Sequence, residues 1–281
     1  MQSTMKITRA MELIAASRIV RAQQRVEAAR PYATQLTRAM EDIARQTGGL
    51  AHPLLEERES PAHVGVLLLT SDRGLAGAYN ANVIRRAEQL TGGIVGRGLQ
   101  PVLYVVGKKG QSYFRFRGVP MRGEWSGISE VPTYGAAEEI GGMLVDDFAS
   151  HVIDELTCVY TQFVSAFRQQ ATDARFLPIA PKEIEGTKGT PSAEYVFEPA
   201  PEEILDVLLP QYVVTKVYSA LLESAASENA ARRRAMKAAT ENAEDLIKVL
   251  SRQANQARQA EITTEIMEIV GGAEAQSVQS K

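Results

Sequence analysis

Apolar residues near the N-terminus recur alternately four and three positions apart, and this spacing limits the fold more than any other feature. The series continues over nine positions without a gap: Ala15, Ile19, Ala22, Val26, Ala29, Ala33, Leu36, Met40 and Ile43. An average spacing of 3.5 residues places them in one stripe of a helix that supercoils left-handed around a partner. Four of the nine are alanines, so the partner backbone can approach closely.

The other end of the chain supplies a matching stripe. The same rhythm is kept by Met236, Ala239, Ala243, Leu246 and Leu250, and Ala254 and Ala257 follow after a shift of one position. We therefore expect the terminal helices to pair in a long antiparallel coiled coil, with a globular domain between them.

The lengths of these helices follow from their helix-breaking residues. The first helix is predicted over Thr4–Arg45, about 60 Å long, with Pro31 bending but not ending it. Gly48 and Gly49 should end it. In the last helix, Gln211–Val270 contains neither proline nor glycine and would span about 90 Å. Pro210 should interrupt this region, and Gly271–Gly272 should end it.

Between the helices, buried strands alternate with short helices. Nearly continuous apolar runs predict strands at Val64–Thr70 and Pro101–Val106, and alternation predicts Glu155–Phe163. Helices are expected at 80–90, 108–116 and 136–149, an irregular segment at 117–133, and later strands at 175–179 and 194–197. Pro178 makes the first of these later strands an edge candidate. The order predicts a three-layer α/β, Rossmann-like domain with a mostly parallel sheet.

The expected division is therefore an N-terminal coiled-coil helix at 1–57, an α/β domain at 58–200 and a C-terminal coiled-coil helix at 201–281. A Gly/Lys/Thr/Pro loop falls at 182–191, and its role is open.

Composition argues against a membrane-spanning protein and against a disulfide-stabilised one. The chain has 281 residues and a net charge of −3, and no apolar run approaches the roughly 20 residues of a membrane span. The sole cysteine, Cys158, excludes an internal disulfide and favours a reducing compartment. Residues 1–46 carry eight basic and four acidic side chains, which suggests either contact with acidic surfaces or a solvated helix face.

No motif for catalysis, cofactor or metal was found. Gly107-Lys108-Lys109-Gly110 follows a strand but lacks the P-loop spacing, and we interpret it as a basic turn. The loop Ser71-Asp72-Arg73 has the position of an active site, but no histidine nearby in sequence could activate a nucleophile, so a docking surface is favoured. Arg232-Arg233-Arg234 has no interleaved aromatic residue. A solvated or salt-bridged face is therefore favoured over nucleic-acid binding.

Three segments carry a family resemblance. Lys6-Ile7-Thr8-Arg9-Ala10-Met11-Glu12-Leu13-Ile14-Ala15-Ala16-Ser17 resembles the N-terminal signature of the γ subunit of F-type ATP synthases. The segment 257–266, ARQAEITTEI, together with 268–273, EIVGGA, resembles its C-terminal signature. Ser71–Gly77 resembles its first strand–loop. Five residues precede the N-terminal motif here, fewer than the family usually has, which implies a shorter two-helix part.

The resemblance implies a non-catalytic rotor shaft without cofactors, coupling proton flow to ATP synthesis or hydrolysis. Its partners would be the α, β, δ and ε subunits and the membrane c-ring, with no nucleic acid, at the cytoplasmic face of a bacterial membrane. By resemblance, Arg258, Gln259 and Thr263 would contact the catch loop of β, and Arg9 and Met11 would lie in the neck. An ordinary solvated or seam position remains the alternative for these five residues.

Two other functions are the alternatives. A free-standing α/β enzyme with a coiled-coil oligomerisation arm would need a catalytic cluster and would bind nucleotide tightly. A coiled-coil adaptor or nucleic-acid-binding arm would bind DNA or RNA with an affinity that falls steeply with salt.

Overall fold

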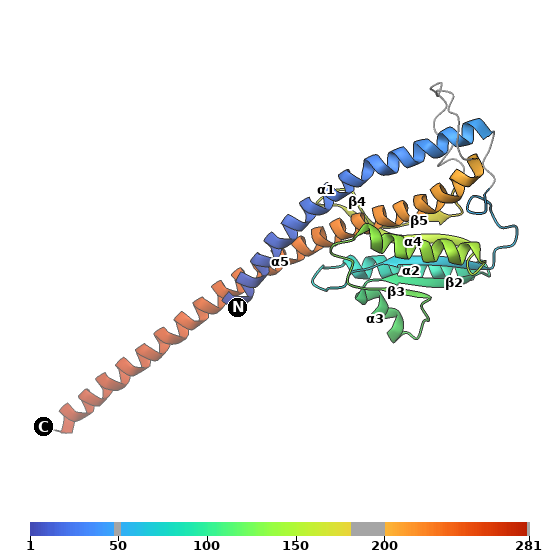
Figure 1. Ribbon diagram of the computed structural model, residues 1–281. Coiled ribbons are helices and arrows are strands. Elements are labelled where there is room, and N and C mark those ends of the chain that lie inside the picture. The colour runs from blue at the N-terminus through green and yellow to red at the C-terminus, as the bar shows by residue number, and fades with distance from the viewer. Residues whose placement is uncertain (48–51, 181–199, 280–281) are drawn as a thin grey trace. The chain divides into compact units, whose positions relative to one another are not determined.

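The computed structural model describes residues 1–47, 52–180 and 200–279 (Figure 1). Two compact units are present in the chain. The smaller contains Met1–Leu13 and Met236–Lys281, and the larger contains Ile14–Ala235. The predicted strand at 194–197, the loop at 182–191 and the glycines at 48 and 49 lie outside the described residues.

Two long helices contain both ends of the described chain. Helix α1 spans Gln2–Thr47 and passes through Pro31 without ending, as the uninterrupted seam predicts. Helix α5 spans Pro201–Gln279. The predictions that Pro210 interrupts this helix and that Gly271–Gly272 ends it are wrong. Leu205 and Leu209 are fully packed in the core before Pro210, so burial offsets the hydrogen bond lost at proline. Glycine costs about 1 kcal/mol in a helix but does not forbid it.

In the larger unit, the predicted seam of α1 is its buried stripe. Ala15, Ile19, Ala22, Leu36, Met40 and Ile43 are at most 8% exposed, and Val26, Ala29 and Ala33 are half-buried. The side chains of Leu36, Met40 and Ile43 join the main core together with residues of α5 such as Leu209 and Val213. The heptad spacing therefore identified the face on which α1 packs.

The sheet of the larger unit has five strands in the order β3-β2-β1-β4-β5. The strands are β1 His63–Leu69, β2 Gln100–Val106, β3 Gly123–Trp125, β4 Glu155–Phe163 and β5 Gln169–Leu177. The pairs β1–β2, β1–β4 and β2–β3 are parallel, with Leu67 opposite Tyr104 and Cys158, and β5 is antiparallel to β4 at the edge. The edge position predicted from Pro178 is confirmed.

Helices cover both faces of the sheet, so the three-layer prediction is confirmed (Figure 1). One face carries α4, Tyr134–Ala149, with the helix pair α1 and α5, and Ile140, Leu144 and Phe148 are completely buried there. The other face carries α2, Tyr79–Gly96, and α3, Lys108–Phe116. The strand β3, within the segment predicted to be irregular, was missed because three residues are too short to show a period.

In the smaller unit, residues 1–13 of α1 run antiparallel to α5. The hydroxyls of Thr8 and Thr240 lie 2.7 Å apart, and Met5 and Lys6 line a cleft with Ile247 and Lys248. The antiparallel pairing of the terminal helices is therefore confirmed, but the partner predicted for the α1 seam is wrong. Its residues 15–43 belong to the larger unit, and Leu246, Leu250, Ala254 and Ala257 of the predicted α5 stripe are exposed.

The apolar character of α5 reaches the level of a membrane span by length and composition. One 18-residue window within Glu203–Val270 has a mean hydropathy of 1.2, and 44% of it is buried inside the protein. A core helix of a soluble protein has the same properties, so this window is weak evidence for a span.

Candidate functional site: the C-terminal helix and the loop after the first strand

The residues predicted to contact partner subunits all lie in the smaller unit. Arg258, Gln259 and Thr263 are exposed on α5, and the hydroxyl of Thr263 donates a 2.8 Å hydrogen bond to the carbonyl of Gln259. Arg9 is exposed and lies 4.0 Å from Glu244, and Met11 is half-buried. The structure does not bring the two groups together. Residues 258–263 lie about 15 Å or more along α5 beyond the residues that face Met5 and Lys6.

Around these positions α5 presents apolar side chains to solvent. Ile262 is 46% exposed, Ile266 55% and Met267 70%, and Ala254 and Ala257 are also exposed. Large apolar side chains that are exposed in series indicate a surface used for contact with other proteins.

A second region of interest is the crevice at the carboxyl ends of β1 and β4. The chain continues from β1 to β2 on one side of β1 and later places β4 on its other side, so this is the point where the strand order reverses. Ligands of open α/β sheets bind at such a point. Helix α5 lies over this crevice. Ser227 Oγ donates to the carbonyl of Thr161 at 3.0 Å, and Ser224 Oγ accepts from the backbone amide of Thr161 at 3.4 Å.

A buried ion pair of α5 closes the same crevice. Arg232 donates to Glu228 at 2.5 Å and to the carbonyl of Gly74 at 3.4 Å, and the two side chains are 7% and 1% exposed. Burial raises the pKa of the Glu228 carboxyl, and Arg232 opposes part of that shift. Of the two predicted alternatives, the solvated face is therefore wrong for Arg232. It is salt-bridged, but to Glu228 of its own helix and not to an acidic loop. Arg233 and Arg234 are exposed as expected.

The space left beside this pair offers little chemistry. A cleft of about 360 Å³ remains, lined by Ala76, Gly77, Ala231 and other residues. Its lining, all within the described chain, contains no carboxylate, histidine or cysteine. Tyr79, at the base of the loop, is buried against Ala76 and Ala231, and burial raises the pKa of its phenol.

The loop after β1 is fixed by its own side chains. Asp72 accepts hydrogen bonds from the amides of Lys108 at 3.2 Å and Ser129 at 3.1 Å. Burial works against ionisation of Asp72, but the hydrogen bonds from these amides and from the amide of Gly127 outweigh the effect of burial. The pKa of Asp72 therefore lies below its usual value. Glu130 lies 2.7 Å from Arg18 of α1 and 3.5 Å from Arg73 of the loop. The loop therefore docks the helix pair within the larger unit.

The basic turn after β2 is not built to hold phosphate. The amides at the start of α3 are already bonded: Lys108 to Asp72, Lys109 to the carbonyl of Ser71 and Gly110 to the hydroxyl of Thr70. Gly107 has φ +95°, and a Cβ there would lie 2.2 Å from the Thr70 carbonyl oxygen. The close approach explains the glycine without a ligand.

Cys158 is fully buried in β4 and its thiol is free. Burial raises the pKa of this thiol well above its ordinary range. The cysteine therefore acts as a small core residue, as the sequence predicts. The described residues contain no cluster of three His, Cys, Asp or Glu side chains that could hold a metal ion.

Sequence reasoning missed the residues that fasten α5 to the sheet. Glu228, Ser227 and Ser224 follow the spacing of one helix face, but polar residues in a helix predict an exposed face. A run of small residues around them, such as Ala225, Ala226 and Ala230, was the available signal of close packing.

The fold and site define a protein with two long pairing helices, an α/β domain whose ligand crevice is covered by its own helix, and an exposed protein-contact surface. Comparison with known proteins identifies the family. The family model described as ATP synthase matches residues 1–276. The chain belongs to the gamma chain family of ATP synthase, the central stalk rotor subunit.

Similar proteins cover nearly the whole chain. The "ATP synthase gamma chain" of Parafrankia sp. is 51% identical, covering 98% of this chain and 93% of that protein. The gamma chain of Mycolicibacterium smegmatis is 50% identical, covering 97% and 93%. The central stalk/c-ring structure of Tetrahymena thermophila mitochondrial ATP synthase has a TM-score of 0.62, 25% identity, and covers 83% of this chain and 99% of its own. A Euglena gracilis mitochondrial ATP synthase chain (OSCP/F1/c-ring) matches in fold, with a TM-score of 0.60, 16% identity and coverage of 97% and 96%.

Proposed function

We propose that this chain is the non-catalytic central shaft that couples proton flow through a membrane c-ring to ATP synthesis or hydrolysis at β subunits. Its partners in this proposal are α, β, δ and ε subunits and the c-ring, at the cytoplasmic face of a bacterial membrane. The observation that carries it is family membership over residues 1–276 together with the paired terminal helices.

The described site supports a mechanical rather than a catalytic role. A paired helix with an interdigitated seam resists bending, which transmission of torque requires. An asymmetric shaft contacts each of three β subunits differently, and a few kcal/mol of difference shifts their conformational populations strongly. Ser224, Ser227 and the Glu228–Arg232 pair cover the switch-point crevice, and the cleft that remains has no carboxylate, histidine or cysteine in its described lining, in support of a non-catalytic chain.

We assign functional parts along the chain on this basis. Residues 1–57 and 201–281 would form the shaft, and residues 58–200 would form the foot that meets the c-ring and ε. The exposed face of α5 around Arg258, Gln259 and Thr263 would contact the β catch loop, and Arg9 and Met11 would lie at the neck. The exposed apolar side chains of Ile262 and Ile266 favour such a contact on the same stretch of helix.

Reconstitution tests the proposal. The purified full chain should hydrolyse no ATP alone, and mixed with α, β and ε it should copurify at one copy per α–β ring and support rotation of a probe attached to the α/β domain. Hydrolysis by the chain alone, or a failure to enter the ring, would contradict it.

The contact assignment has its own test. Arg258→Ala combined with Gln259→Ala should reduce the torque or coupled ATP synthesis of the reconstituted complex, while Arg252→Ala, another exposed position on α5, should leave both close to the unmodified level. Equal behaviour of the two variants would remove the assignment and leave the shaft role intact.

A further inference from the structure

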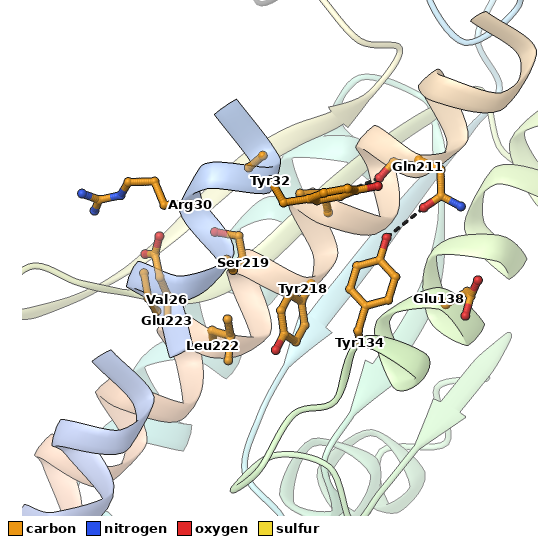
Figure 2. A pocket seen from close by; sticks show the side chains of 13 residues that line it. Val26, Arg30, Tyr32, Tyr134, Glu138, Gln211, Tyr218, Ser219, Leu222 and Glu223 are labelled. Atoms are coloured by element: carbon orange, nitrogen blue, oxygen red, sulfur yellow. Dashed lines mark hydrogen bonds between the residues drawn. The ribbon is translucent and has the colours of Figure 1, made fainter. Parts of the chain in front are cut away.

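A cleft of about 670 Å³ opens in the larger unit between α1, α4 and α5 (Figure 2). This volume falls within the range of about 300–1,000 Å³ that is typical of small-molecule sites. The cleft interrupts the buried seam of α1. Val26, Ala29 and Ala33 line it and are half-buried, whereas Ala22 and Leu36 on either side are buried. The opening is thus part of the helix pair, at a point where small seam residues leave space.

Three tyrosines from three helices line the cleft. The ring centroids of Tyr32 of α1 and Tyr134 of α4 are 6.4 Å apart at 86°, and those of Tyr134 and Tyr218 of α5 are 5.5 Å apart at 76°. Tyr134 is held in place by the hydrogen bond that its hydroxyl donates to Gln211 Oε1 at 2.8 Å. Rings set at right angles around one space present both faces and edges to it, and the faces attract cations.

The charges of the lining also favour a cation. In Figure 2 the rings lie between the carboxylate of Glu223 on one side and that of Glu138 on the other, and the side chain of Arg30 points away from them. Oε2 of Glu223 is buried and accepts no hydrogen bond from the described residues. Burial raises the pKa of this carboxyl, and a hydrogen bond from the backbone amide of Phe163 opposes part of that shift. A buried carboxylate oxygen without a donor is costly, so a positively charged ligand beside it would be stabilising. An anion would face two carboxylates.

We propose that this cleft binds a small organic ammonium ion with an apolar body, its charge held by the tyrosine rings and the Glu223 carboxylate. The site uses neither the exposed face of α5 nor the covered crevice of the sheet, so it is separate from the contacts proposed with the β subunits. Because its lining comes from α1, α4 and α5, a bound ligand joins the helix pair to the α/β layer inside the larger unit.

Three probes with one aromatic body test the charge preference on the unmodified full chain. Calorimetric titration should give saturable binding of benzyltrimethylammonium and at least about tenfold weaker binding of neutral benzyl alcohol and of anionic benzenesulfonate, as loss of a cation–π and ion-pair contact predicts. Equal affinity for all three probes, preference for the anion, or no saturable binding of the cation would overturn the proposal.

Substitutions then locate the site. Glu223→Gln keeps the shape of the side chain and removes its charge, and Tyr134→Leu removes one ring. Each substitution should lower the affinity for benzyltrimethylammonium about tenfold. Glu244→Gln and Tyr113→Leu make the same changes outside the cleft and should leave binding unchanged. Unmodified binding by both cleft variants would overturn the assignment of the site, and the probe comparison does not depend on how any variant folds.

Discussion

Glu228 and Arg232 form an ion pair of 2.5 Å that is buried where α5 crosses the carboxyl ends of the strands. The pair lies one helical turn apart on α5, and Arg232 also reaches the carbonyl of Gly74 in the loop after β1. At this turn the Arg232 guanidinium therefore attaches the long helix to the α/β layer, in addition to the hydrogen bonds of Ser224 and Ser227 earlier in the helix. In a shaft, such a contact fixes both the rotation and the axial position of α5 on the α/β layer.

Removing one partner of this pair should destabilise the protein strongly. Arg232→Met leaves the Glu228 carboxylate buried without its cation, which costs about 3–5 kcal/mol. The double variant Glu228→Leu/Arg232→Met removes both charges and should be less destabilised than the single one. Chemical denaturation followed by circular dichroism measures the free energy of unfolding of both variants. A double variant that is less stable than Arg232→Met would show that the unpaired Glu228 carboxylate is not the cause of the loss.

The glycine after β2 should be intolerant of any side chain. Gly107→Ala places a Cβ 2.2 Å from the Thr70 carbonyl at a positive φ of 95°, and a loss of about 3 kcal/mol or more is expected. Gly92→Ala is the matched control, because it lies within α2 with nothing within 4 Å of the added Cβ. That control should gain about 0.5–1 kcal/mol from helix propensity. Thermal melts of the two variants that shift in the same direction would contradict the argument.

Acid should weaken the contact between the starts of β1 and β4. Asp154 Oδ2 accepts from the amides of Ala62 at 2.8 Å and His63 at 2.9 Å. Burial opposes ionisation of Asp154, but these donors outweigh it and lower its pKa. A lowered folded-state pKa contributes stability above the unfolded value of about 4, and this is lost as pH falls through the folded-state value.

Asp154→Asn should therefore cost about 2 kcal/mol near pH 7 and much less below pH 3, because the charged hydrogen bonds are absent at low pH in both proteins. Denaturation at several pH values measures the difference. Asp146→Asn, at an exposed position of α4, should cost less than about 0.5 kcal/mol throughout. A cost for Asp154→Asn that stays constant with pH would rule out the charge as its cause.

Seam positions of α1 should contribute more to stability than positions off the seam. Met40→Ala removes a completely buried side chain and should cost about 2–5 kcal/mol. Val20→Ala changes a side chain that is 52% exposed on the same helix and should cost less than about 1 kcal/mol. Denaturant midpoints compare the two. Similar losses would mean that the heptad positions do not define the packed face.

The sequence alone determined which residues face a partner along α1 and which strands form the centre of the sheet. Heptad spacing identifies a helix face because the period is local, and continuous apolar runs such as Val64–Thr70 and the alternation of Glu155–Phe163 are equally local signals. The helix at Lys108–Phe116 and the strand at Glu155–Phe163 have the predicted bounds. Their ends coincide with turn residues that act within a few positions.

Only the tertiary structure decided where the polar residues of α5 lie and how far that helix runs. Arg232 and Glu228 satisfy each other in the interior, and nothing local distinguishes a buried ion pair from an exposed one at the same spacing. Pro210 is tolerated because distant core residues compensate for its missing hydrogen bond. The tyrosine-lined cleft likewise depends on three helices that are far apart in sequence, and the spacing within any one of them carries no information about the other two.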